Sequence, residues 1–193
     1  MNAVHLTTSD FVRQPWKNGG GTTTQLAREE GGERWLWRLS LAEVERSGPF
    51  SDFDGYERTL LLVEGEGMEL TIEGGASLTL REPYEALVFD GGARVACRLL
   101  GGPVKDLNLI VDRRRARTTV EVIAPARCRG TRLGSRWVLA YALRGATRIA
   151  AAGLECTLAA GELLRVDDAR DGALGLAAVD GAALLALVRI DPK

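Results

Sequence analysis

The sequence has very few histidines and cysteines, and each scarcity excludes a kind of site. The one histidine is His5, so a proton shuttle that works at neutral pH is hard to build from this chain. The three cysteines, Cys97, Cys128 and Cys156, are scattered and lack Cys-x-x-Cys spacing, which argues against a disulfide framework or a zinc site. A cysteine nucleophile would need a base, and His5 lies upstream of every recognisable motif. We therefore expect buried free thiols.

Long hydrophobic runs are also missing. The longest apolar run, residues 182–188, is far too short to span a bilayer. The first residues are polar and acidic and do not form a signal peptide. We therefore expect a cytoplasmic protein with no membrane partner.

The two halves of the chain differ in charge. Residues 1–112 carry 11 basic and 18 acidic side chains, whereas residues 113–193 carry 14 and 8. A basic segment can bind nucleic acid, but this one has no interleaved aromatics and no helix-turn-helix pattern, so we expect no nucleic-acid partner. Contact between the two halves, or between the subunits of a homodimer, explains the asymmetry more simply.

Short β-rich segments separated by glycine turns are abundant. Such turn signals, recurring at short intervals, predict an antiparallel all-β protein of the sandwich or barrel type. The predicted strands lie at 22–27, 34–44, 58–63, 68–72, 77–80, 85–89, 95–100, 107–111, 118–123, 136–143, 147–151, 162–166, 174–179 and 182–190.

Two stretches suggest an internal duplication. Residues 60–67 and residues 137–145 each form an apolar strand that ends in a glycine turn and leads into another strand. Two jelly-roll barrels in tandem would explain this repetition. We predict an N-terminal barrel over residues 1–112 and a C-terminal, degenerate barrel over residues 113–193.

A glycine-rich turn follows Trp16, Lys17 and Asn18. Glycine allows a tight turn with accessible N–H groups, while Lys17 and Asn18 add polar side chains, so the stretch is suited to holding a small anion. Lysine is rare in this chain, which has 22 arginines and three lysines, and two of the three, Lys17 and Lys105, lie beside glycine pairs or runs. Because lysine and arginine are not interchangeable where space is tight, we expect specific roles for both lysines. The alternative is a simple turn.

Several motifs together resemble those of the HutD/Ves family. In the family's order they are PWKNGGGT (15–22), WRLSLAEV (37–44), GPFS (48–51), GYERTL (55–60) and GPVKDLN (102–108). The matches cover roughly residues 5–112, and the second half is similar only in its general β character. The resemblance implies a bicupin, in which two small β-barrels pack as one unit. It also implies a bacterial protein associated with histidine utilisation.

Metal-dependent cupins hold their metal with two or three histidines and a glutamate. This chain has one histidine, outside the expected barrel strands, so we expect no metal and no other cofactor.

A polar cluster is therefore the candidate binding site. Asp106 and Asn108 are two residues apart, hence on one face of an extended segment. Arg38 alternates with apolar residues on its strand and is expected to point into the barrel. There are two alternatives to a binding site. The face that carries Asp106 and Asn108 is exposed to solvent, or Arg58 forms an ion pair at the rim of the barrel. The expected ligand-binding residues are Trp16, Lys17, Asn18, Arg38, Arg58, Lys105, Asp106 and Asn108.

The function favoured by these residues is binding of a small carboxylate metabolite, of the urocanate or formylglutamate class that the resemblance implies. In that interpretation Lys17 and Arg58 pair with carboxylate, and Trp16 covers a flat ring. A metal-free isomerase or hydrolase, with Lys17 or Lys105 as acid or base and Asp106 as partner, remains an alternative. So does a stress-related interaction protein like those of the Ves branch. Because no nucleophile and base are paired in the sequence, binding is favoured over catalysis.

Overall fold

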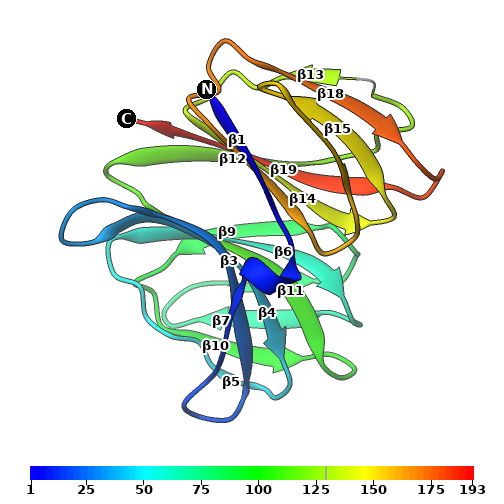
Figure 1. The fold of residues 1–193 in the computed structure, drawn as a ribbon. Coiled ribbons are helices and arrows are strands. Elements are labelled where there is room, and N and C mark those ends of the chain that lie inside the picture. Colours follow the sequence, from blue (N-terminus) through cyan, green and yellow to red (C-terminus); the bar gives the residue numbers. More distant parts are fainter. Residues whose placement is uncertain (129) are drawn as a thin grey trace. The chain divides into compact units, whose positions relative to one another are not determined.

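The computed structural model describes residues 1–128 and 130–193 and is built almost entirely of antiparallel strands (Figure 1). The expected all-β fold is thus confirmed. In these two ranges the helical structure is a single 3-10 turn at Thr8–Asp10, and no helix is long and apolar enough to cross a membrane. The chain divides into two compact units.

The first unit, called here the N-terminal barrel, comprises residues 12–115. It contains two antiparallel sheets. The first has the order β2 (Val12–Pro15), β3 (Gly21–Glu30), β4 (Trp35–Val44), β11 (Val104–Asp112), β6 (Tyr56–Glu64) and β9 (Ala86–Asp90). The second has the order β5 (Gly48–Pro49), β10 (Val95–Leu99), β7 (Met68–Ile72) and β8 (Ser77–Leu80).

The second unit, the C-terminal barrel, combines residues 1–11 with residues 116–193. One of its sheets has the order β1 (Asn2–Leu6), β17 (Leu163–Asp167), β14 (Trp137–Arg144), β19 (Leu184–Pro192) and β12 (Ala116–Ile123). The other has the order β13 (Gly130–Arg132), β18 (Ala173–Ala178), β15 (Thr147–Ala151) and β16 (Leu154–Leu158).

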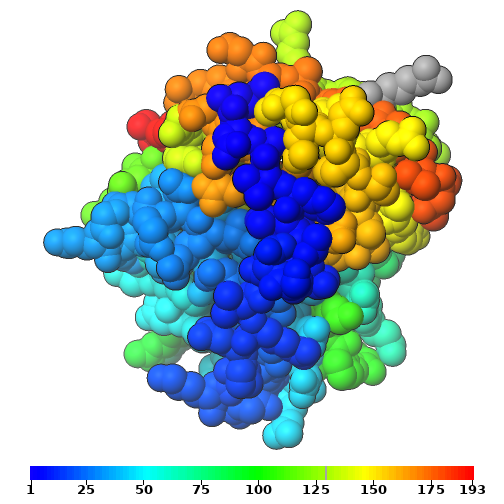
Figure 2. All heavy atoms as spheres, in the orientation of Figure 1, coloured from blue at the N-terminus to red at the C-terminus, as the bar shows by residue number. Residues whose placement is uncertain are grey.

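The predicted division between residues 112 and 113 differs from this arrangement at the start of the chain. Strand β1 pairs with β17, from Asn2 opposite Asp167 to Leu6 opposite Leu163. Figure 2 shows these first, dark-blue residues against yellow and orange atoms of the C-terminal barrel. Residues 1–11 therefore belong to the C-terminal barrel, because the backbone hydrogen bonds of β1 are made there.

The predicted duplication is visible in the strand orders. Strands β4, β11, β6 and β9 are neighbours in the first barrel, and β12, β19, β14 and β17 occupy the same order in the second. The second sheets correspond in the same way, β5-β10-β7-β8 with β13-β18-β15-β16. The two barrels therefore share one topology.

The interiors of the two barrels differ in polarity. The core of the C-terminal barrel is formed by apolar side chains, among them Leu133, Leu158 and Leu185, and the buried polar residues described there, Ser135 and Thr147, are uncharged. The N-terminal barrel has an apolar core around Leu60, Met68 and the other residues of its cluster, but buried charged and polar side chains lie beside it. A ligand site is therefore to be sought in the N-terminal barrel.

Candidate functional site

A pocket of about 530 Å³ lies in the N-terminal barrel. Strands β2, β3, β4, β6 and β11 contribute to its wall, together with the loop between β2 and β3 and the segment from Pro49 to Phe53. Seven of the eight residues expected from the sequence line it, and Lys105 is the exception. The lining residues are Gln14, Pro15, Trp16, Lys17, Asn18, Thr23, Arg38, Ala42, Val44, Pro49, Phe50, Ser51, Phe53, Arg58, Asp106 and Asn108.

Strand β11 brings Asp106 and Asn108 to the pocket, as their spacing predicts. Side chains alternate across a strand, so these two residues face inward while Leu107 and Leu109 face the opposite side. The exposed fractions of Asp106 and Asn108 are 1% and 7%. The alternative of a solvent-facing polar face is therefore wrong.

Arg58 on β6 is the buried cation of the pocket, with an exposed fraction of 5%. Its guanidinium carbon lies 5.1 Å from the ring centre of Phe50, 5.4 Å from that of Phe53 and 5.1 Å from that of Phe89. At these distances the positive charge interacts favourably with all three rings. The expected alternative of an exposed ion pair at the rim is thus wrong.

The guanidinium of Arg58 is only partly satisfied by hydrogen bonds. Its Nη1 donates to the Ser51 carbonyl oxygen at 3.5 Å, while its Nε is buried with no hydrogen-bond partner in the described chain. Burial lowers the pKa of Arg58 to about 10, with Asp106 opposing this effect and Arg38 adding to it. Arg58 therefore stays protonated at neutral pH and keeps donors available inside the pocket.

Arg38 on β4 is a second cation on the same wall. Strand register places Arg38 and Arg58 on either side of Ile110 in β11. The guanidinium carbon of Arg38 lies 5.3 Å from the ring centre of Trp35 and 5.2 Å from that of Phe53. Its buried Nε has no hydrogen-bond partner among the described residues, and burial, followed by the nearby Arg28, lowers its pKa.

Asp106 is a buried acid in this cationic pocket. Burial raises its pKa from the ordinary value of 3.8 to about 7, although Arg58 acts in the opposite direction. Its Oδ1 is buried and receives no hydrogen bond from the parts of the chain that the structure describes. Burial, and then the charge of Asp106, raise the pKa of Cys97 in β10 to about 12, so this thiol stays protonated. Asp106 is thus able to exchange a proton near neutral pH.

Four buried polar atoms of the pocket share this lack of a protein partner. They are the Nε atoms of Arg38 and Arg58 and the Oδ1 atoms of Asp106 and Asn108. A buried polar group without a hydrogen bond costs about 1–3 kcal/mol, so water or a ligand is expected to satisfy these atoms. The pocket therefore offers both hydrogen-bond donors and acceptors to a small polar molecule.

The glycine-rich turn has a structural explanation. The N–H of Gly19 donates to the Trp16 carbonyl oxygen at 3.0 Å, and the N–H of Gly20 donates to Asn18 Oδ1 at 2.9 Å. Because both N–H groups are used inside the turn, the expectation that they hold an anion is wrong. A Cβ on Gly21 would collide with the Glu43 carbonyl oxygen and would lie 3.2 Å from the Trp16 ring. Glycine is therefore required where β3 passes closely between β4 and Trp16.

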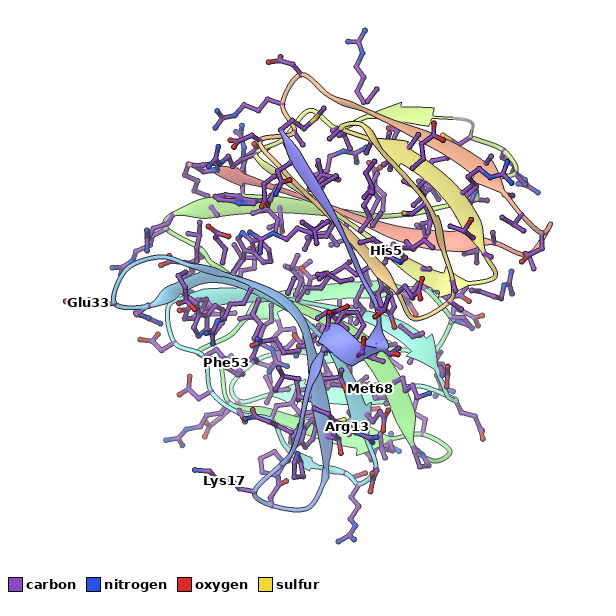
Figure 3. The ribbon with its side chains drawn as sticks, viewed as in Figure 1. His5, Arg13, Lys17, Glu33, Phe53 and Met68 are labelled. Carbon is purple, nitrogen blue, oxygen red and sulfur yellow. The ribbon has the colours of Figure 1, made fainter. Side chains whose placement is uncertain are left out.

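The three residues of this motif that precede the glycines lie along the pocket, but they differ in orientation. Trp16 is half-buried, its Nε1 donates to Thr23 Oγ1 at 2.8 Å, and its ring meets that of Phe50 edge-on. Asn18 is exposed, and its side-chain oxygen is used in the turn. Lys17 is exposed, and Figure 3 shows its side chain extending from the loop away from the barrel. Contact between Lys17 and a ligand carboxylate remains a prediction, with weaker geometric support than Arg58 has.

Lys105 lies outside the pocket. It precedes Asp106 on β11, so alternation turns it toward the other side of the sheet, where its Nζ lies 2.9 Å from Glu64 Oε2. The expectation that Lys105 shares the site with Asp106 is therefore not met by the geometry.

The aromatic residues around Arg58 were not predicted from the sequence. Phe50 and Phe53 come from the segment between β5 and β6, and Phe89 comes from β9, directly opposite Arg58 in register. Their spacing in the chain has no recognisable period. The one available signal was the motif that contains Phe50, residues 48–51.

This arrangement defines a class of protein, a bicupin with a cationic pocket in its N-terminal barrel. The solved structure of Bacillus subtilis oxalate decarboxylase shares the fold, with a TM-score of 0.66 and 10% identity over 98% of this chain and 77% of that one. The HutD family model matches residues 8–186. The chain belongs to the HutD family.

Relatives and solved structures agree with this assignment. The chain is 43% identical over 118 residues to an uncharacterised protein of the hutC 3′ region of Pseudomonas putida, a match that covers 60% of this chain and 62% of that protein, less than two thirds of its length. It is 31% identical over 137 residues to protein Ves of Citrobacter koseri, covering 69% of each.

Two solved structures are similar over nearly the whole chain. A conserved protein of unknown function from Pseudomonas aeruginosa PAO1 has a TM-score of 0.86 and 32% identity, covering 99% of this chain and 100% of that one. HutD from Pseudomonas fluorescens SBW25 has a TM-score of 0.82 and 29% identity, covering 100% of both chains.

A cupin metal centre does not fit the residues of this pocket. The oxalate decarboxylase has Mn(II) centres. Within residues 1–128 and 130–193, no three His, Cys, Asp or Glu side chains are placed to hold a metal ion together. Asp106 is the one acidic residue in the pocket lining, and the cations Arg38 and Arg58 lie on the same wall. This donor set suits an anion and not a metal cation.

Proposed function

We propose that this protein is an accessory or regulatory protein of histidine utilisation that binds a small carboxylate metabolite, of the urocanate or formylglutamate class, in its N-terminal barrel. Two observations support a role in this pathway: the family to which the chain belongs, and the location of the Pseudomonas putida relative in the hutC 3′ region. A cytoplasmic location is part of the proposal. Cys97, Cys128 and Cys156 are all unpaired, in keeping with a reducing compartment.

The observation that carries the proposal is the setting of Arg58. A guanidinium presents parallel N–H donors that match the two oxygens of a carboxylate. Here it is 5% exposed, held among three phenyl rings and left with a buried Nε that has no partner in the described chain. A charge-assisted hydrogen bond is stronger in such a water-poor site than at the surface. A carboxylate is the anion that best complements this group.

The other lining residues suit the remainder of such a ligand. Asn108 Oδ1 is a buried acceptor without a partner in the described chain, and it can receive an N–H of an imidazole or an amide. Trp16 and Phe50 provide apolar surface for a flat or aliphatic portion. The pocket volume of about 530 Å³ falls within the range of small-molecule sites.

Titration calorimetry with urocanate and with N-formylglutamate tests the proposal, using the parent protein and Arg58→Gln. Charged hydrogen bonds contribute about 1.5–3 kcal/mol each, so the variant should bind roughly 10- to 150-fold more weakly. Arg13→Gln is the matched control, because Arg13 is an exposed arginine of the same barrel, paired with Glu43. Arg13→Gln should bind like the parent.

Two results would contradict the proposal. One is that neither compound binds the parent at millimolar concentration. The other is that Arg58→Gln, with an unchanged circular dichroism spectrum, binds as tightly as the parent.

A metal-free isomerase or hydrolase is the second candidate, and Asp106 is the observation that favours it. A carboxyl whose pKa is about 7 can accept and return a proton at neutral pH. Incubating urocanate or N-formylglutamate with the parent, and following the proton NMR spectrum, should then show turnover that Asp106→Asn lacks. An unchanged spectrum, in a sample that binds the compound, would contradict catalysis on that compound.

A further inference from the structure

Asp106 is a buried acid that lies in the pocket without a hydrogen bond to its Oδ1 in the described chain, and carboxylate binding at Arg58 leaves it unexplained. We propose that Asp106 is protonated in the liganded pocket and donates a hydrogen bond to the bound carboxylate, so that the site takes up one carboxylate together with one proton. Asp106 then contributes to ligand specificity, because it favours a ligand with an oxygen that can accept this hydrogen bond. This inference rests on the proposed function.

Strand register explains why Asp106 is poorly solvated. It lies opposite Ala42 on β4 and opposite Leu62 on β6, and neither neighbour offers a polar side chain. Arg58 lies opposite Ile110, four residues further along β11. The charges of Asp106 and Arg58 still affect each other. The charge of Arg58 therefore affects the pKa of Asp106, although the residues directly opposite Asp106 on the neighbouring strands are apolar.

Few other groups can titrate near Asp106. Arg58 on β6 and Arg38 on β4 are cations, and Cys97 on β10 stays protonated because its pKa is raised to about 12. Lys17, on the loop between β2 and β3, is exposed at the pocket edge. The N-terminal barrel contains no histidine in its sequence, residues 12–115. Asp106 is thus the group whose proton can couple to binding between about pH 6 and about pH 8.5.

A bound carboxylate changes the electrostatic balance at Asp106. Arg58 is the neighbour that favours the ionised form of Asp106, and the negative ligand offsets its charge. Two carboxylates in one poorly solvated site cannot both ionise easily, so they share a proton. The ligand oxygen accepts this proton in a hydrogen bond from Asp106, while Arg58 donates to the same carboxylate. A neutral amide in place of the carboxylate would lose the charge interaction with Arg58.

Calorimetry at several pH values, with N-formylglutamate and separately with acetate, tests the inference. Both probes stay fully ionised between about pH 6 and about pH 8.5, so their own titration does not contribute. For the parent, the affinity should be constant below about pH 7 and should fall about tenfold per pH unit above it. Titration in two buffers of different ionisation enthalpy should show uptake of nearly one proton at about pH 8.

Asp106→Asn and Asp52→Asn form the variant pair. The asparagine amide at position 106 can still donate a hydrogen bond but cannot titrate, so its affinity should be flat with pH and should exceed that of the parent at about pH 8.5. Asp52 is an exposed acid between β5 and β6, and Asp52→Asn should keep the pH dependence of the parent.

The outcomes separate this inference from the proposed function. Binding of either probe by the parent, with no proton uptake and a flat affinity, would overturn the role of Asp106 and leave carboxylate binding intact. Persistence of the pH dependence in Asp106→Asn would also overturn it. Absence of binding at every pH would contradict the proposed function itself. The proton uptake of the parent decides the question even if Asp106→Asn does not fold.

Discussion

Replacing Asp106 by asparagine should stabilise the protein, and the gain should grow with pH. In the folded protein the pKa of Asp106 is raised from 3.8 to about 7, because burial disfavours the charged carboxylate. An unfolded chain exposes this group to water and restores its ordinary value. Between about pH 4 and about pH 7 the folded state therefore binds more protons than the unfolded state, and its stability falls as pH rises.

The size of the stability change follows from the difference between the pKa values of Asp106 in the folded and unfolded states. One pKa unit corresponds to about 1.4 kcal/mol, so the change from 3.8 to about 7 corresponds to about 4 kcal/mol of lost stability in total. About 3 kcal/mol of this loss falls between pH 5 and pH 8, most of it below pH 7, where the unfolded chain is ionised and Asp106 in the folded protein still holds its proton. Asp106→Asn carries no titrating group at this position and escapes the loss. Arg58 stays protonated over this range and adds no pH dependence of its own, because its pKa is about 10.

Urea unfolding of the parent and of Asp106→Asn, at several values between pH 5 and pH 8, measures the effect. The difference in unfolding free energy between the two proteins should shift by about 2–3 kcal/mol in favour of the variant across this range. Other titrating groups are common to both proteins and cancel. Asp52→Asn, which changes an exposed carboxyl, should show no such shift. A difference that stays constant within about 0.5 kcal/mol from pH 5 to pH 8 would refute the assignment of a buried, proton-holding carboxyl.

Two further predictions concern the turn and the metal. Gly21→Ala should lower the thermal unfolding temperature, because the added methyl group collides with the Glu43 carbonyl oxygen and presses on the Trp16 ring. Gly48→Ala, where φ is not positive and the new Cβ meets nothing within 4 Å, is a control for the cost of replacing glycine in the same barrel. Equal unfolding temperatures for both variants would show that the close approach at Gly21 is relieved easily. Elemental analysis of protein purified without chelator should find no stoichiometric transition metal, because the pocket lining contributes Asp106 as its one acid beside two cationic arginines; iron, manganese or zinc at one equivalent would contradict this.

Much of the fold could be predicted because the strands are regular and their turns are rich in glycine. The predicted strands at 68–72, 77–80 and 147–151 coincide with β7, β8 and β15. The sequence does not predict β1, β2, β5 and β13, because these strands are short, and β1, β5 and β13 also gain their definition from partners far along the chain. The sequence also does not predict β16. It follows a turn at Ala152 and Gly153, where positive φ angles reverse the chain although the sequence has no glycine pair there.

The site was predictable where it depends on local geometry. The alternation of a strand was enough to place Asp106 and Asn108 together and to turn Arg38 inward. The rarity of lysine indicated Lys17, but composition carries no information about the direction of a side chain, and Lys17 is exposed. The phenyl rings around Arg58 come from two separate segments of the chain, so only the tertiary fold brings them together.

The pairing of β1 with β17 has a consequence for the order in which the protein is made. A ribosome releases residues 12–115 early, so every strand of the N-terminal barrel is available before β17 has been synthesised. At about 5–20 residues per second, β1 must wait about 8–30 s for its partner. During this time its backbone N–H and C=O groups remain without their sheet partners on β17, and the sheet of the C-terminal barrel can be completed only after β19 has also emerged. Strand β1 therefore leaves the ribosome long before it can join a sheet.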